Sequence, residues 1–195
     1  MKILTITDRL TNCYLLPIDG GWVMFDAGWP DTLPEMLRLL QRHNVYINDI
    51  DYLIVSHFHP DHAGLAQNIK DFGTKLILHE CQVPFVKKLN QYYKKRPEAG
   101  FRDIETANCI IMNSADSRNF FDDIGIGGEL IQTPGHSDDS ISLIVDDACA
   151  FIGDLPDPDL AEAYDDPQIE DSWDLIRSHP VKTIYPAHGK PYELS

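Results

Sequence analysis

The stretch from Ser56 to Gly64 constrains this chain more than any other part of its sequence. It reads Ser-His-Phe-His-Pro-Asp-His-Ala-Gly, so three imidazoles and one carboxylate fall within six consecutive positions. The apolar residues 52–55 just before it are typical of a short buried strand, and residues 63–69 are typical of a helix. Neutral imidazole and carboxylate are the usual ligands of zinc and related divalent ions. The pattern predicts a strand-to-helix turn that presents metal ligands.

The spacing of these ligands indicates two metal ions rather than one. His57 and His59 are two positions apart, so in an extended segment their side chains point the same way and suit one ion. Asp61 and His62 follow the turn at Pro60 and point elsewhere, which suits a second ion. Two-metal hydrolytic sites hold their ions roughly 3.5–4 Å apart. A lone histidine is more often structural, but this density of ligands behind a buried strand favours a metal site.

Three further ligand-type residues, His136, Asp154 and His188, follow predicted strands that end near residues 133, 152 and 185. Side chains at one edge of packed sheets can converge on a single site, so we expect these three to join the first group. Asp26, at the end of an apolar run, either supports the ligands from behind or is simply a turn residue before Gly28. The residue pattern alone favours neither of these two roles for Asp26 over the other.

The segment His57-x-His59-x-Asp61-His62 resembles the signature of the metallo-β-lactamase fold superfamily, and the resemblance extends from Asp26 to His188. It implies an α/β fold, a four-layer αββα sandwich of two mixed sheets flanked by helices, in a single domain over residues 1–195. It also favours the supporting role for Asp26. The ligand sets that the resemblance implies are His57, His59 and His136 for one ion and Asp61, His62 and His188 for the other, with Asp154 bridging them.

The function that the resemblance implies is that of a dinuclear metallohydrolase, with zinc as the expected metal and iron or manganese as alternatives. A water between two divalent ions loses a proton readily, since its pKa falls to about 7. The resulting hydroxide would attack an ester, thioester, lactone or phosphoester of a small molecule. Asp61 is the expected catalytic residue, orienting the nucleophile and passing a proton to the leaving group. Asp154 argues against the commonest true β-lactamases, which have Cys at this position.

Two alternative functions remain open on the sequence. A mononuclear iron enzyme similar to the superfamily's sulfur dioxygenases would use a three-ligand site from His57, His59, His136 or Asp154. A metal-dependent nuclease is the other. The net charge of −15 disfavours it, because an acidic surface repels nucleic acid and anionic membranes. One departure from the family pattern is the loop Ser137-Asp138-Asp139-Ser140, which alters the surroundings of His136.

The segment 81–118 differs from the rest of the chain because it holds seven basic and four acidic residues. We expect a helical insert there that lines the site and attracts an anionic substrate; the alternative is a solvated helix face. No stretch approaches the roughly 20 apolar residues of a membrane span, and residues 1–9 turn polar too early for a signal peptide. The expected location is therefore cytoplasmic, with four scattered, unpaired cysteines.

The remaining patterns predict the elements around the site. Asp19-Gly20-Gly21 indicates a hairpin between two early strands. The acidic segment 154–172 is typical of an exposed loop, followed by a helix that Asp171 or Ser172 caps. Helices are further expected over residues 31–43, 83–93 and 117–125, and strands over residues 75–79, 129–133, 140–145, 148–152 and 182–185.

Overall fold

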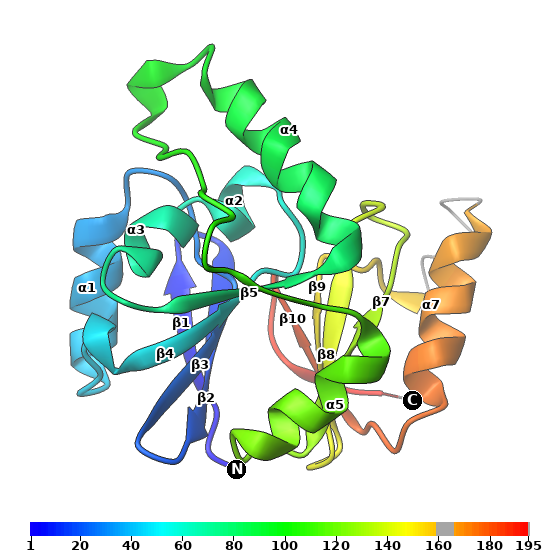
Figure 1. Cartoon of the computed structure of the whole chain (residues 1–195). Coiled ribbons are helices and arrows are strands. Elements are labelled where there is room, and N and C mark those ends of the chain that lie inside the picture. Colours follow the sequence, from blue (N-terminus) through cyan, green and yellow to red (C-terminus); the bar gives the residue numbers. More distant parts are fainter. Residues whose placement is uncertain (159–165, 195) are drawn as a thin grey trace.

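Two β-sheets face each other in the computed structural model, which describes residues 1–158 and 166–194. Helices cover the outer face of each sheet (Figure 1). The first sheet has the order β1-β2-β3-β4-β5-β6, and the second β11-β10-β9-β8-β7. The first contains β1 (Leu4–Asp8), β2 (Thr11–Ile18), β3 (Gly21–Phe25), β4 (Ile50–Ile54), β5 (Lys75–His79) and β6 (Ile110–Met112). The second contains β7 (Gly128–Gln132), β8 (Ile141–Val145), β9 (Cys149–Gly153), β10 (Thr183–Pro186) and β11 (Tyr192–Glu193).

Both sheets are mixed, as predicted. Strands β1, β2 and β3 form an antiparallel meander, whereas β3, β4, β5 and β6 run parallel to one another. In the second sheet only the β9–β10 pair is parallel. The parallel pairs need crossover helices, which bury the outer faces of the sheets. The described helices are α1 (Leu33–Arg42), α2 (Pro60–Ala63), α3 (Ala66–Lys70), α4 (Val83–Tyr93), α5 (Ser114–Asp123) and α7 (Pro167–Arg177), with 3₁₀ turns at Ile47–Asp49, Glu80–Gln82 and Pro97–Ala99.

Three apolar clusters lie between the four layers and hold them together. The first lies between the first sheet and α1, α3 and α4. The second fills the space between the sheets, where Phe25 and Phe151 approach with ring centroids 5.7 Å apart. The third packs α7 onto the second sheet around the fully buried Trp173. Each buried aromatic or aliphatic side chain contributes about 1.5–3 kcal/mol, so the sandwich is fixed by packing on both faces of both sheets.

Several predicted boundaries differ from the structure. The expected helix over 63–69 is two short helices, α2 and α3. Helix α2 begins earlier than predicted, at Pro60, because the fixed φ of proline suits a first helical turn. Helix α7 begins at Pro167 and is capped by Asp166, whose side chain accepts a hydrogen bond from the backbone N–H of Gln168. The prediction of a cap at Asp171 or Ser172 is therefore wrong. Of the predicted acidic loop, residues 159–165 lie outside the described residues.

The segment 81–118 contains more than helix. Helix α4 lies at the predicted residues, but Ile110–Met112 forms β6, the edge strand beside β5. This three-residue strand is too short to give a period-2 pattern. That the segment is an insert in a single domain stays a prediction.

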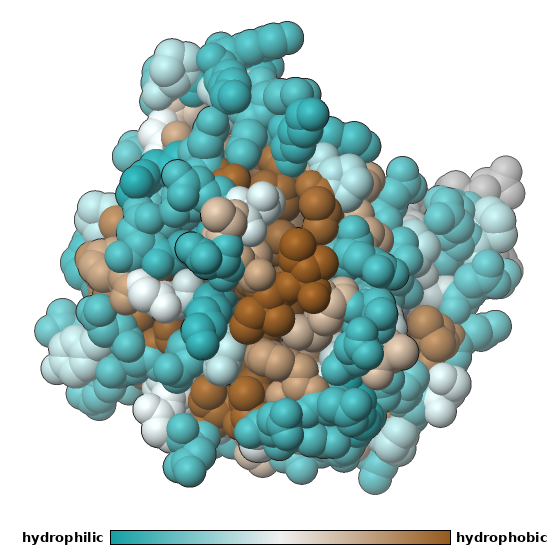
Figure 2. Space-filling view, in the orientation of Figure 1, coloured by the Kyte–Doolittle hydropathy of each residue, from teal (hydrophilic) through white to brown (hydrophobic). Residues whose placement is uncertain are grey.

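The face shown in Figure 2 is mostly hydrophilic, with an apolar band between α4 and α5. Ile111 of β6 is 53% exposed. Among the described residues, no helix has both the length and the apolar character needed to cross a bilayer. The expected cytoplasmic location stays a prediction.

Candidate metal centre

The predicted site residues follow the C-terminal ends of strands at one edge of the sandwich. Asp26 directly follows β3, and His57 comes three residues after β4. His136 lies in the loop after β7, Asp154 directly follows β9, and His188 lies two residues beyond β10. Sheet packing brings these segments together from both halves of the chain. The backbone N–H of Ile141, for example, donates to the carbonyl of Ser56 over 2.9 Å.

The structure sorts the seven predicted ligands into two groups. In each group one ligand atom per residue lies within 4.8 Å of all the others. The first group contains His57, His59 and His136, and the second contains Asp61, His62, Asp154 and His188. The spacing argument for the division of the motif agrees with this geometry: the first two histidines belong to one group and Asp61 and His62 to the other.

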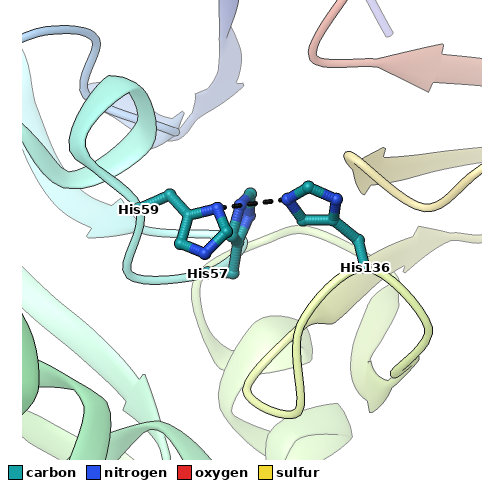
Figure 3. A group of neighbouring side chains, drawn as sticks. All are labelled: His57, His59 and His136. Carbon is teal, nitrogen blue, oxygen red and sulfur yellow. Dashed lines mark hydrogen bonds between the residues drawn. The ribbon is translucent and has the colours of Figure 1, made fainter.

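The first group is formed by two loops that face each other across the edge of the sandwich. Figure 3 shows His57 and His59 on the segment after β4 and His136 opposite them on the loop after β7. The Nε2 atom of His136 lies 3.1 Å from Nδ1 of His59. The His57 ring is fully buried, whereas 32% of the His136 side chain is exposed. The group is therefore open to solvent on the His136 side.

Asp154 lies between the two groups. Its Oδ2 atom is 3.3 Å from Nε2 of His62 and 3.5 Å from Nε2 of His136. Its Oδ1 atom is 3.3 Å from Nε2 of His188. One carboxylate thus contacts histidines of both groups. The approach depends on Gly153 (φ 57°), where a Cβ would lie 2.6 Å from Cβ of Ser56.

Asp26 lies behind the motif and contacts it through hydrogen bonds. The carboxylate is fully buried and accepts hydrogen bonds from the backbone N–H of Ser56 over 2.7 Å and from the Ser56 hydroxyl over 3.0 Å. It also lies 2.9 Å from Nδ1 of His62. A carboxylate at Nδ1 keeps the proton on that nitrogen and leaves Nε2 free as a ligand atom.

His188 is oriented in the same way by a backbone carbonyl. Its Nδ1 atom lies 2.8 Å from the carbonyl oxygen of Leu10, and Nε2 faces Asp61 at 3.3 Å. The side-chain amide of Asn12 holds the His188 loop by donating to the carbonyl of Gly189 over 2.8 Å. The first hairpin therefore positions a predicted ligand that lies about 180 residues further along the chain.

Two supporting residues were missed by the sequence reasoning. Asp139 accepts a hydrogen bond from the backbone N–H of Phe58, between two of the histidines, over 2.8 Å. The fully buried Gln82 donates to the carbonyl of Val55 over 2.8 Å and to that of Asp139 over 3.2 Å. The unusual loop sequence around Asp139 was a signal that pointed toward its position, whereas no sequence pattern distinguishes Gln82.

Burial and neighbouring charges set the ionisation states of the site. Burial lowers the pKa of His57 well below its usual value, and also lowers that of His136. Burial alone would raise the pKa of Asp61, but the nearby His62 ring outweighs it and brings that pKa to about 2. Burial opposes the charged form of His62, yet the neighbouring carboxylates of Asp26, Asp154 and Asp61 hold its pKa well above the usual value. Two neutral histidines and an ionised Asp61 are the ligand forms that divalent ions bind.

The residues fit a metal centre because three of their buried ligand atoms make no hydrogen bond. His57 Nε2, His62 Nε2 and Asp154 Oδ1 are buried and make no hydrogen bond. An unsatisfied buried polar group costs about 1–3 kcal/mol, so three at one place require compensation. Divalent ions at the two groups would satisfy all three atoms.

Comparisons with known proteins agree with the geometry. A family model described as the metallo-beta-lactamase superfamily matches residues 6–188. A beta-lactamase-like protein 2 homolog from Drosophila melanogaster is 25% identical over 187 residues, which cover 94% of this chain and 60% of that protein. An N-acyl homoserine lactonase from a Bacillus species is 24% identical over 159 residues, covering 69% of this chain and 57% of the lactonase. The chain thus spans less than two thirds of either relative.

A solved structure shows the same architecture. The structure of a metallo-beta-lactamase from Cronobacter sakazakii superposes with a TM-score of 0.75 at 20% sequence identity. The superposition covers 96% of this chain and 77% of the other. At that identity the likeness concerns the fold, and it confirms the predicted two-sheet sandwich flanked by helices.

Proposed function

Because this chain belongs to the metallo-beta-lactamase superfamily, we propose that it is a metal-dependent hydrolase that works with two divalent ions. The observation that carries the proposal is the position of Asp154, whose carboxylate faces His62 and His136 with one oxygen and His188 with the other. A structural zinc site is closed by four ligands. Seven ligand-type residues in two adjoining groups, open to solvent at His136, suit chemistry on a substrate.

The proposed residue assignment follows the two groups. His57, His59 and His136 would hold one ion, Asp61, His62 and His188 the other, and Asp154 would contact both. Two divalent ions there would lower the pKa of water and stabilise negative charge on the substrate oxygen. Zinc is the metal we expect, since imidazole and carboxylate are its ordinary ligands.

Asp61 has the position for a second role. Its side chain is 17% exposed and lies 3.3 Å from Nε2 of both His62 and His188. The Thr11 hydroxyl also approaches it at 3.4 Å. We assign Asp61 the orientation of the attacking water and the transfer of its proton toward the leaving group, because it is an ionised carboxylate at the solvent side of the centre.

The proposed substrates are small molecules with an ester, thioester, lactone or phosphoester bond. The relative named N-acyl homoserine lactonase supports the lactone class. The net charge of −15 disfavours nucleic acid as a substrate. A single-stranded oligonucleotide belongs in the test panel to decide this point.

The experiment has a metal readout and an activity readout. Metal-free protein is titrated with Zn²⁺, Mn²⁺ or Fe²⁺, the bound metal is counted, and each loaded form is assayed on a lactone, a thioester, a phosphodiester and the oligonucleotide. We expect two ions per chain and hydrolysis of at least one small molecule. Asp154→Asn should lower both occupancy and activity, whereas Asp138→Asn, on the exposed part of the neighbouring loop, should change neither. One iron per chain with oxygen consumption would instead establish the iron-enzyme alternative.

A further inference from the structure

A pocket of about 550 Å³ opens directly beside the candidate metal centre. It begins at His59 and Asp61 and extends to helix α4, which projects above the site edge of the sandwich (Figure 1). Pockets of about 300–1,000 Å³ are typical of small-molecule sites. The residues that line this pocket therefore indicate which substrates the candidate metal centre would accept.

The walls of the pocket are mainly apolar. Phe58 and Leu89 are buried at its base, and Phe85 and Tyr92 line its outer part. Phe85, Leu89 and Tyr92 recur at helical spacing, so they lie on one face of α4. Tyr92 is 47% exposed, which leaves aromatic surface free to contact a ligand.

Lys88 brings one cation to this apolar surface. Its Nζ atom lies 3.8 Å from the centroid of the Phe85 ring, so the ammonium is held at the pocket wall. Among residues 1–158 and 166–194 no carboxylate forms an ion pair with Lys88, although the chain has 31 acidic residues. A second pocket of about 620 Å³ shares Lys88 and Tyr92 and continues to Lys94, Lys95 and Arg96. Lys88 thus lines both the pocket that reaches His59 and Asp61 and the neighbouring pocket that holds the other basic residues of this helix end.

We propose that the substrate is an anionic amphiphile: an ester, thioester or lactone with an apolar acyl or aryl group and a carboxylate or phosphate. The apolar group lies against Phe58, Phe85 and Leu89, and the anion pairs with Lys88. The carbonyl group then lies at His59 and Asp61. Hydrolysis adds water across the acyl C–O or C–S bond and gives a carboxylic acid and an alcohol or thiol. This inference rests on the proposed function for the reaction, but the binding of the amphiphile does not.

The first test measures binding to the metal-free protein, where no hydrolysis occurs. The probes are 4-phenylbutyrate, its neutral amide and 3-phenylpropyl phosphate, with affinity measured by calorimetry. We expect the carboxylate or the phosphate to bind about threefold to fivefold more tightly than the amide, as for a partly exposed ion pair. Lys88→Glu should remove this preference. The matched control Lys87→Glu, on the same helix but outside the pocket, changes the net charge equally and should retain it.

A chain-length series tests the apolar wall. Straight-chain carboxylates from four to ten carbons should gain about fourfold in affinity per buried methylene until the pocket is filled. Equal affinities across the series would overturn the apolar part of the proposal. A missing preference for anions, or an equal loss in both lysine variants, would overturn the role of Lys88.

The activity test separates the two proposals. For the metal-loaded chain, the ratio of kcat/KM for an anionic ester to that for a neutral ester of the same size should fall about tenfold in Lys88→Glu and stay unchanged in Lys87→Glu. If the metal-loaded chain hydrolyses nothing but the binding pattern holds, the proposed function fails and the pocket assignment stands. If hydrolysis occurs without the anionic preference, the pocket assignment alone fails.

Discussion

Replacing Asp26 with Asn tests how the buried carboxylate organises the metal centre. The change keeps the shape of the side chain but removes its charge and turns one acceptor oxygen into a donor. In the structure the carboxylate receives the backbone N–H of Ser56 on Oδ1, and the Ser56 hydroxyl and His62 Nδ1 both approach Oδ2. An amide that keeps its oxygen at the Oδ1 position directs its NH₂ at His62.

The amide NH₂ group would change the tautomer of His62. Because the amide NH₂ is a hydrogen-bond donor, Nδ1 of His62 must accept its hydrogen bond. The ring proton therefore moves to Nε2, which is the atom directed at Asp61 and Asp154. A protonated Nε2 cannot bind a metal. Loss of such a supporting partner typically costs 10–100-fold in metal affinity. The lost charge-assisted hydrogen bond should also lower the free energy of unfolding by about 1.5–3 kcal/mol.

Two measurements on the same protein check this reasoning. Urea unfolding of the metal-free protein gives the stability, and competition with a chromophoric chelator gives the zinc affinity. Asp8→Asn is the matched control, because Asp8 is equally buried and accepts hydrogen bonds from Trp29 and Thr32 but contacts no predicted ligand. The control should lose stability and keep its zinc affinity. Zinc affinity of Asp26→Asn equal to that of the unchanged protein would refute the tautomer argument.

The remaining predictions concern stability. Chelation of a protein loaded at 1,000 times its Kd should cost about 4 kcal/mol and lower the Tm by about 10 °C in calorimetry, and an unchanged Tm would contradict the metal centre. Gly64→Ala should destabilise the fold by more than about 2 kcal/mol, because its Cβ would lie 2.3 Å from the backbone nitrogen of Pro30. Gly73→Ala is strained only by the φ of 105° at that position and should cost about 1 kcal/mol. Equal losses of stability in the two variants would count against the steric argument. Burial lowers the pKa of His79 below 6.5, so the folded chain binds a proton at this residue more weakly than the unfolded chain. The contribution of His79 to the free energy of unfolding is therefore complete above pH 6.5 and declines as the pH falls below that value. In urea titrations at several pH values, the free energy of unfolding of His79→Gln should decline less steeply on acidification.

Local patterns sufficed for much of the fold. The hairpin at Gly20, helix α4 and strand β8 were predicted within one or two residues, because alternation, turn glycines and helical spacing are properties of neighbouring residues. Strand β6 and the start of α7 were not. A strand of three residues carries no period, and a proline that begins a helix looks the same in sequence as one that ends a loop.

The sequence by itself predicted the chemistry of the site: which side chains are candidate ligands, their order along the chain, and the division of the motif into two groups. Those properties depend on residue type and on spacing over six positions. The resemblance implied that Asp154 lies between the groups and that His136 shares a group with His59, but the contacts that bring these residues together come from the tertiary structure. Tertiary structure alone placed Gln82 behind the motif and Lys88 beside it. Contacts between residues 30 to 180 positions apart depend on how two sheets pack, and no local pattern records that packing.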